Sequence, residues 1–167
     1  MKKILALFVA LMMLFSVTAL AEAPVYVEDL YEGTWVAFVD DGFEMYVPSE
    51  WLQVELTDDV IASGTYYAVV SPDETCALTV SWSALHTTTD TATLATMFNM
   101  MYPGAEAMVI GDYEAVCYVD TENDTLGFAI LDATEPGMYL FNFAPASNQD
   151  IVALATAIMA SIRDIAQ

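Results

Sequence analysis

Basic side chains are almost missing from this chain. Its 167 residues contain 24 Asp and Glu but only three Lys and Arg, and the formal net charge is −21. Two of the three are Lys2 and Lys3, so Arg163 is the single basic side chain in the rest of the sequence. Nucleic acids and anionic lipid headgroups are bound largely through the positive charge of Lys and Arg. We therefore expect neither a nucleic acid nor an acidic membrane surface as a partner.

The excess of acid has two interpretations. It can attract cationic partners or divalent ions, or it can keep the protein soluble in a salty medium that screens self-repulsion beyond roughly 8 Å. The acidic residues are spread along the whole sequence and are not collected in one tail. This distribution favours the second interpretation, a general solubility coat.

Catalytic side chains are also scarce. His86 is the one histidine, and the sequence contains no Gly-x-Ser-x-Gly segment, so a Ser-His-Asp nucleophile has no recognisable basis. One histidine and two distant cysteines do not form the ligand set of a zinc site. We predict no catalytic, cofactor-binding or metal-binding residue, and we expect His86 at the surface or at a strand end.

The two cysteines are Cys76 and Cys117. A disulfide between them is permitted in an exported chain. Both also fall on predicted apolar strand faces, so a pair of buried free thiols explains them equally well. A thiol nucleophile is disfavoured, because a reactive thiolate needs a positive neighbourhood and this chain has almost no positive charge.

The N-terminus has the pattern of a signal peptide. Two lysines precede an apolar run over residues 4–20, and Ala19-Leu20-Ala21 has the small-x-small pattern of a cleavage site. Cleavage leaves a mature chain that begins at Glu22. An uncleaved anchor is the alternative, since the run approaches the length that crosses a bilayer. No cysteine follows the run to carry a lipid.

We therefore predict three segments: a signal peptide over residues 1–21, an N-terminal lead-in over residues 22–33 and a single domain over residues 34–167. A domain of this size can bury a core without metals or disulfides. The predicted location is secreted or extracytoplasmic, with no stable membrane insertion after cleavage.

Many short segments alternate apolar and polar residues, which is the period of half-buried β-strands. In the clearest early segment Phe43, Met45 and Val47 share one face. Pro48 must end it, because proline cannot donate to a strand ladder, and Trp51 is expected to fold back over the sheet. A weaker alternation covers residues 52–61. The predicted strands cover residues 34–39, 43–47, 66–70, 76–82, 107–110, 113–119, 126–132 and 138–143.

A first helix is predicted over about residues 90–102. Asp90 is a good N-cap. The apolar residues Leu94, Met97, Phe98 and Met101 then recur at i, i+3, i+4 and i+7, as expected for the buried face of a helix.

A second helix is predicted over about residues 148–165. Ser147 is its expected cap, and Arg163 falls in its last turn, where a positive charge favours the helix dipole. Because its apolar stripe is continuous, this helix must dock on the sheet. The stripe consists of Ile151, Leu154, Ile158, Ile162 and Ile165. The predicted class is α+β.

Calcium is the metal most compatible with an acidic exported chain. Asp120-x-Glu122-x-Asp124 imitates the first ligands of an EF-hand loop, but Thr125 replaces the required glycine and Leu131 the bidentate glutamate. A solvated hairpin loop is the better interpretation. Weak Ca²⁺ binding there or at Asp40-Asp41 stays open.

Two less specific features suggest other chemistry. A carboxylate pair could catalyse glycoside hydrolysis, but among 24 acids some pair lies at a suitable separation by chance. Trp35, Trp51, Tyr66 and Tyr67 could form a stacking platform for a sugar or a peptide. Strand alternation favours core packing for each of these aromatic residues.

The order of the elements resembles the PsbP/Mog-like superfamily over roughly residues 34–165. The resemblance implies an α/β/α sandwich with a central, mostly antiparallel sheet, and it carries no shared catalytic residues. Members look like non-enzymatic partners: extrinsic photosystem subunits, a binder of a small GTPase and many exported bacterial proteins. The segments that carry it are Phe43-x-Met45-x-Val47-Pro48-x-x-Trp51, Gly111-Asp112-Tyr113-x-Ala115, Gly137-Met138-Tyr139-x-x-x-Phe143 and the helix end at Ala160-Ser161-Ile162.

The sequence thus predicts a secreted non-enzymatic binding or accessory module, without a cofactor, whose partner is an unidentified protein or cell-envelope component. The scarcity of lysine and arginine departs from the better-known members of the superfamily and argues against a basic docking surface. The alternative is a small acidic extracellular hydrolase that uses a carboxylate pair.

Overall fold

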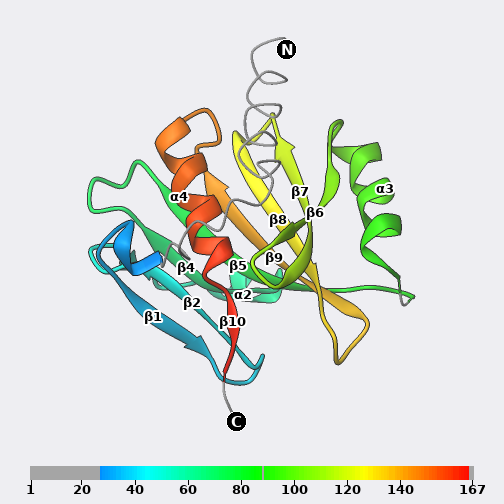
Figure 1. Cartoon of the computed structure of the whole chain (residues 1–167), viewed down its shortest axis with the longest axis horizontal. Coiled ribbons are helices and arrows are strands. Elements are labelled where there is room, and N and C mark those ends of the chain that lie inside the picture. Colours follow the sequence, from blue (N-terminus) through cyan, green and yellow to red (C-terminus); the bar gives the residue numbers. More distant parts are fainter. Residues whose placement is uncertain (1–26, 88, 166–167) are drawn as a thin grey trace, which may run out of the picture.

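The computed structural model describes residues 27–87 and 89–165 (Figure 1). The predicted signal peptide and the first residues of the lead-in lie outside this described part. The helical elements are a short 3-10 helix η1 (Val27–Asp29) and the helices α2 (Asp58–Ala62), α3 (Thr91–Met101) and α4 (Gln149–Ala160). The strands are β1 (Gly33–Phe38), β2 (Phe43–Pro48), β3 (Leu52–Gln53), β4 (Thr65–Val70), β5 (Ala77–Ala84), β6 (Glu106–Ile110), β7 (Tyr113–Asp120), β8 (Thr125–Leu131), β9 (Gly137–Ala144) and β10 (Arg163–Asp164).

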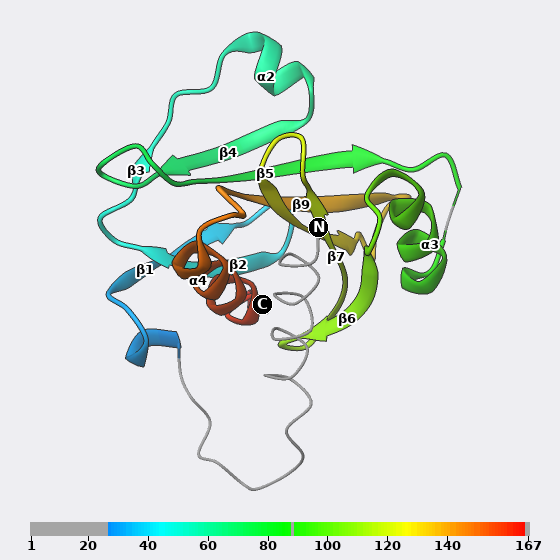
Figure 2. The ribbon, with the colours of Figure 1, turned by 90° about the horizontal axis from the view of Figure 1, so that it is seen from above.

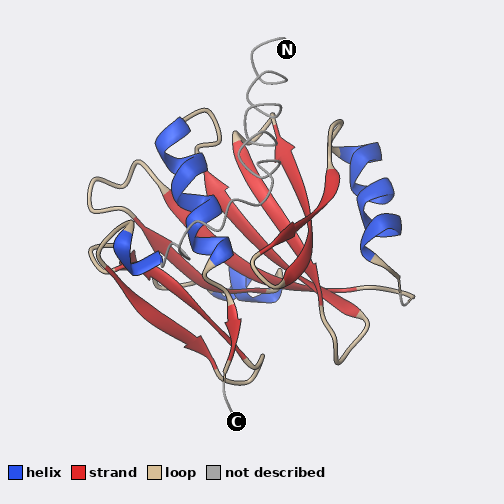
Figure 3. Ribbon diagram, viewed as in Figure 1, coloured by secondary structure: helices blue, strands red, loops and turns tan. Residues whose placement is uncertain are grey.

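The strands form two antiparallel sheets (Figure 3). The larger one, sheet B, has seven strands in the order β3-β4-β5-β9-β8-β7-β6. The smaller one, sheet A, has the order β1-β2-β10. All the strand pairs are antiparallel, so the predicted mostly antiparallel sheet is confirmed.

Helices cover both faces of sheet B, and the views in Figures 1 and 2 place α3 and α4 well apart. The main core lies between one face of sheet B, helix α4 and sheet A. A second, smaller core lies on the opposite face, where α3 covers β6 and β7. This arrangement confirms the predicted α+β class and the two main helices.

Strand β2 supplies the apolar face that the sequence predicts. Phe43, Met45 and Val47 are all buried in the main core. Trp51 follows the turn after β2 and packs partly buried against the same core, as expected. The lead-in also reaches this region, since the Tyr31 hydroxyl donates a hydrogen bond of 2.6 Å to the Tyr46 carbonyl oxygen.

The strand-like alternation predicted over residues 52–61 is only partly present in the structure. Its weak alternation forms only the two-residue strand β3, and the chain then turns into the short helix α2. Asp58 and Asp59 stand in the first turn of α2, where negative charge interacts favourably with the positive end of the helix dipole. This local preference outweighs the alternating pattern.

Helix α3 begins as predicted but buries a different face. The Asp90 side chain accepts a hydrogen bond of 2.7 Å from the Thr93 backbone N–H. Leu94 and Phe98 are buried, whereas Met97 and Met101, predicted to be buried with them, are exposed. The buried face instead includes Thr91 and Ala95, because α3 packs mainly on β6 and β7 and leaves one of its flanks uncovered.

The cap of helix α4 is Asn148, not Ser147. The Asn148 side chain accepts a hydrogen bond of 3.0 Å from the Asp150 backbone N–H. Ser147 is used elsewhere: its backbone N–H and its hydroxyl both donate to the Asp124 carboxylate, at 2.8 and 2.7 Å. The predicted helix cap, Ser147, was therefore wrong by one residue. Ser147 instead donates its hydrogen bonds to Asp124, which lies in a distant loop.

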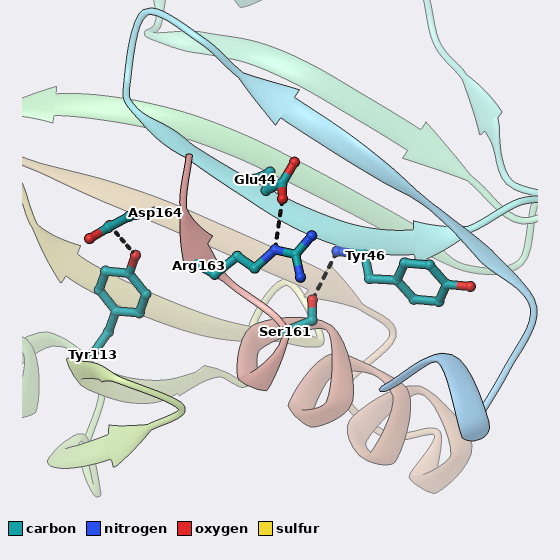
Figure 4. Close-up of polar contacts among 6 residues, drawn as sticks. All are labelled: Glu44, Tyr46, Tyr113, Ser161, Arg163 and Asp164. Carbon is teal, nitrogen blue, oxygen red and sulfur yellow. Dashed lines mark hydrogen bonds and ion pairs between the residues drawn. The ribbon is translucent and has the colours of Figure 1, made fainter. Parts of the chain in front are cut away.

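Helix α4 ends at Ala160, five residues before its predicted end, and the chain continues as an extended segment (Figure 4). The buried Ser161 hydroxyl accepts a hydrogen bond of 2.9 Å from the Tyr46 backbone N–H and donates one of 2.6 Å to the Ile158 carbonyl oxygen. Ile162 remains buried beyond the helix. Arg163 therefore lies in β10, paired with Glu44 of β2, and its predicted place in the last helical turn was wrong.

Replacing the Ser161 hydroxyl tests this junction. Ser161→Ala should lower the free energy of unfolding by ~1–3 kcal/mol, since it leaves the buried N–H of Tyr46 without an acceptor. Urea unfolding followed by tryptophan fluorescence measures the change. Ser63→Ala is the matched control, because the exposed Ser63 hydroxyl makes the same kind of bond to the Val60 carbonyl oxygen. Equal losses in the two variants would contradict the assigned role of Ser161.

Candidate functional site

Polar side chains from distant parts of the chain converge where the β1–β2 turn meets sheet B. The Tyr139 hydroxyl of β9 lies 3.1 Å from Asp41 Oδ1 and 3.3 Å from Asp132 Oδ2. The Trp82 indole N–H of β5 donates to the same Asp132 oxygen at 3.0 Å. Tyr66 of β4 completes this tyrosine–carboxylate cluster. The cluster brings two acidic side chains to one hydroxyl group.

Local sequence places the two carboxylates. Gly42 adopts a φ of 79° in the β1–β2 turn, a left-handed conformation that glycine adopts without strain, and Asp41 precedes it. Asp132 directly follows β8 and accepts hydrogen bonds from the Thr134 backbone N–H and hydroxyl, both at 2.7 Å. The Trp82 ring lies so close to Gly137 that a Cβ there would meet it at 2.4 Å. The turn at Gly42, the hydrogen bonds from Thr134 to Asp132 and the small size of Gly137 thus hold the cluster in place.

The electrostatics of the cluster favour a structural role. Partial burial disfavours the charged form of Asp132, but the hydrogen bonds from Thr134, Trp82 and Glu135 outweigh it and lower the pKa of this carboxyl. Burial raises the pKa of Tyr139, and the nearby carboxylates raise it further. A general acid needs a raised carboxyl pKa. Asp132 is shifted in the opposite direction, so the cluster gives the hydrolase alternative no support.

Tyr66 is the one member of the cluster whose polar group is not satisfied. Its hydroxyl oxygen is buried and, among the described residues, has no hydrogen-bond partner of good geometry. Burial raises the Tyr66 pKa most, and the charge of Asp41 raises it further. The Tyr66 hydroxyl therefore stays protonated beside the Asp41 carboxylate, while the hydrogen bond from Tyr139 to Asp41 joins the β1–β2 turn to sheet B.

The two cysteines are buried free thiols. Cys76 directly precedes β5, and Cys117 lies in β7, with β9 and β8 between these strands in the sheet order. A disulfide requires Cα atoms within about 7 Å, whereas three inter-strand steps span roughly 14 Å. Burial, and to a lesser degree the charge of Glu106, raises the pKa of Cys117 to about 12. The structure thus matches the free-thiol interpretation.

The acidic loop between β7 and β8 uses its carboxylates for its own backbone. Asp120 accepts hydrogen bonds from the backbone N–H groups of Glu122 and Asn123, and Asp124 binds Ser147. The two carboxylates therefore bind different partners: Asp120 binds the backbone of its own loop, and Asp124 binds Ser147. Within the described residues, no group of three or more His, Cys, Asp or Glu side chains is arranged to hold a metal ion.

Arg163 covers one of the candidate aromatic residues. Its guanidinium carbon lies 3.5 Å from the centre of the Trp35 ring, a cation–π contact, and its Nε donates to Glu44 Oε1 at 2.7 Å. Tyr67 is buried in the main core, so it is not free to stack on a ligand. His86 is exposed in the loop after β5, as predicted.

The exposed flank of α3 is the surface that sequence periodicity missed. Met97, Met100 and Met101 are all exposed, Met100 to 76%. The segment from Thr91 to Ala105 contains no Asp, Glu, Lys or Arg. Because the chain has 24 acidic residues, an uncharged segment of this length stands out in the sequence and could have indicated a distinct surface. We call these three side chains the methionine surface.

The fold can now be compared with known proteins. No protein-family model matches the sequence, and no curated protein matches it significantly. The structure is similar to the solution structure of cyanobacterial PsbP (CyanoP) from Synechocystis sp. PCC 6803, with a TM-score of 0.54 and 15% identity over 89% of this chain and 99% of that chain. The fold is PsbP-like. At this identity the likeness concerns the fold alone, and it confirms the architecture that the sequence resemblance implies.

A second likeness is weaker. A crystal structure from Bacteroides thetaiotaomicron VPI-5482 aligns with a TM-score of 0.46 and 15% identity, over 75% of this chain and 46% of that chain. Within the described ranges, none of the helices of the PsbP-like structure combines the length and the apolar composition that crossing a membrane requires.

Asp132 should make stability depend on pH in a predictable direction. Because its pKa is lowered on folding, ionised Asp132 stabilises the fold above the ordinary carboxyl pKa of about 4, and this contribution is lost as the pH falls through the lowered value. Urea midpoints should therefore show the wild type above Asp132→Asn at pH 7, with the gap closing below about pH 4. Glu55→Gln, at an exposed acid outside the cluster, is the control. A gap that does not change with pH would contradict the assignment.

Thiol titration tests the state of the cysteines. Without reductant, an aromatic disulfide reagent should label neither Cys76 nor Cys117 in the native protein at pH 8, because both are buried, and should label both in urea. Absorbance of the released thiolate gives the count. If urea exposes no thiol until a reductant is added, the two cysteines are bridged.

Proposed function

We propose that this protein is a non-enzymatic binding or accessory module that acts outside the cytoplasm. Three observations support the proposal. The fold is similar to cyanobacterial PsbP over nearly the whole of that chain. The thiols are buried, and the convergent carboxylates Asp41 and Asp132 are occupied by hydrogen bonds that hold turns and strands together. The chain also presents an uncharged apolar surface on α3.

The methionine surface is the observation that carries the proposal. Methionine side chains are flexible and polarisable, so an exposed group of them adapts to different apolar contacts. Exposed apolar patches of this kind commonly mark interaction sites. A partner that meets α3 contacts no charge between Thr91 and Ala105, so the expected partner is a protein with an apolar, uncharged contact surface.

Export is part of the same proposal. The basic head, the apolar run over residues 4–20 and the Ala19-Leu20-Ala21 site support a signal peptide over residues 1–21. The partner is then a protein of the cell envelope or of the surrounding medium. The intact mass of the protein recovered outside the cytoplasm should correspond to a chain that begins at Glu22, whereas a full-length mass would overturn this part of the proposal.

Affinity capture tests the binding role. The exported protein, immobilised and exposed to cell-envelope and culture-supernatant extracts, should retain a specific partner at both low and high salt, because apolar contacts are not screened as ion pairs are. The double variant Met100→Glu/Met101→Glu should lose that partner by about tenfold or more, since it places two charges on the apolar contact.

The matched control changes the same number of exposed apolar side chains elsewhere. Val60→Glu/Ile61→Glu alters α2, whose two side chains are also exposed, and should leave capture unchanged. Circular dichroism must show that both double variants keep the fold. Capture that disappears at high salt, or that survives the α3 change and fails with the α2 change, would contradict the proposed surface.

A further inference from the structure

The sulfur atoms of this chain divide between its core and one helix. The two thiols, Cys76 and Cys117, are buried, and Met45 and Met159 are fully buried in the main core. The thioethers of the methionine surface are instead exposed, to 43% at the first of the three, 76% at the second and 62% at the third. In the described part of the chain, solvent therefore reaches sulfur mainly on α3.

Helical spacing gathers these three side chains. Met100 and Met101 follow Met97 by three and four residues, and side chains at these spacings are neighbours on a helix. None of the three belongs to the small core on this face of sheet B, to which α3 contributes Leu94 and Phe98. A chemical change at the three thioethers therefore alters the surface and leaves the core packing as it is.

The cysteines do not compete as targets of an oxidant. The form of cysteine that reacts is the thiolate, and burial raises the pKa of Cys117 to about 12. Cys76 is shielded from solvent in the same way. A thioether has no proton to lose, so its oxidation needs exposure and no positive neighbourhood. Exposed methionines thus suit a chain in which positive charge is almost absent.

We propose that the methionine surface is a site of reversible oxidation by hydrogen peroxide, which converts it from an apolar to a polar surface. A lone pair of the sulfur attacks one peroxide oxygen, and the O–O bond breaks. That oxygen stays on the sulfur as the sulfoxide, and the other leaves with both protons as water. The sulfur loses two electrons and the peroxide gains them. Hydrogen peroxide is uncharged, so the negative charge of the chain does not repel it.

The reverse step needs a dithiol reductant and the methionine sulfoxide reductases, one for each sulfoxide epimer. The dithiol becomes a disulfide, and the sulfoxide oxygen leaves as water. Because the sulfoxide is polar, burying it against an apolar contact without a hydrogen bond is unfavourable. Oxidation therefore releases a partner from α3, and reduction restores binding. This regulatory consequence rests on the proposed function, whereas the oxidation site itself does not.

Peptide mapping of the peroxide-treated protein tests the selectivity. Cleavage after Asp and Glu releases residues 91–106 as one peptide with all three thioethers, and places Met45 and Met159 in two others. The 91–106 peptide should gain oxygen nearly as fast in the native protein as in urea. The other two peptides should lag by about tenfold or more, since buried groups react only when the structure opens. A core methionine or a cysteine that is oxidised equally fast would overturn the proposal.

Retention on a phenyl column measures the surface change without a partner. The peroxide-treated wild type should elute earlier than the untreated protein, and the two reductases with a dithiol should restore its retention. The triple variant Met97→Leu/Met100→Leu/Met101→Leu keeps apolar, helix-favouring side chains but has no sulfur on α3, so peroxide should not shift it.

Met108→Leu is the matched control for the column. Met108 is a half-buried methionine of β6, outside the methionine surface, so peroxide should shift this variant as it shifts the wild type. Circular dichroism must show that every sample keeps the fold. An unshifted wild type, or a triple variant that shifts as far as the wild type, would contradict the assigned site.

Partner capture after oxidation tests the regulation. Once peroxide is removed, the wild type should retain its partner about tenfold less than before treatment, and the triple leucine variant should retain as much after peroxide as before it. Capture by the wild type that peroxide leaves unchanged would overturn the regulatory role. A wild type that captures nothing even before treatment would refute the proposed function and the regulation with it, while the oxidation site would still stand or fall on the peptide map and the column.

Discussion

Burial of β2 is the constraint on which the rest of the structure depends. Phe43, Met45 and Val47 lie in the core that joins sheet A, α4 and one face of sheet B. The edge of β2 away from β1 must also be satisfied, and the C-terminal segment does this with the Ser161 hydroxyl and the pairing of Arg163 with Glu44. One strand thus ties both sheets and the last helix together.

The chain uses its few reactive side chains for this architecture. Its one basic side chain in the described part, Arg163, stacks on Trp35 and binds Glu44. The carboxylates of Asp41 and Asp132 hold two turns against the strands through Tyr139. On the surface, this acidic chain presents the uncharged segment Thr91 to Ala105, which carries the methionine surface.

Local features were predictable from the sequence, and features that depend on distant neighbours were not. The alternation of β2 and the Asp90 cap of α3 are local patterns, and both are confirmed. The end of α4 depends on Tyr46, more than a hundred residues away, because the hydroxyl of Ser161 at the helix C-cap accepts a hydrogen bond from that backbone N–H. Periodicity could not tell which flank of α3 would be covered, since the position of β6 and β7 decides it. For the same reason the meeting of Asp41, Asp132 and Tyr139 left no sequence pattern.

The pairing of the C-terminal segment with β2 has a consequence for the order in which this fold can form. Ile165 donates its backbone N–H to the Gly42 carbonyl oxygen, and Tyr113 binds Asp164, so the first hairpin of the domain is completed by residues more than a hundred positions later in the sequence. While the chain is still emerging, β2 lacks its outer neighbour and α4 is missing from the core. The domain therefore reaches its final packing only after β10 has emerged, and a chain threaded through a translocation channel from its N-terminus would remain loosely folded until β10 has crossed.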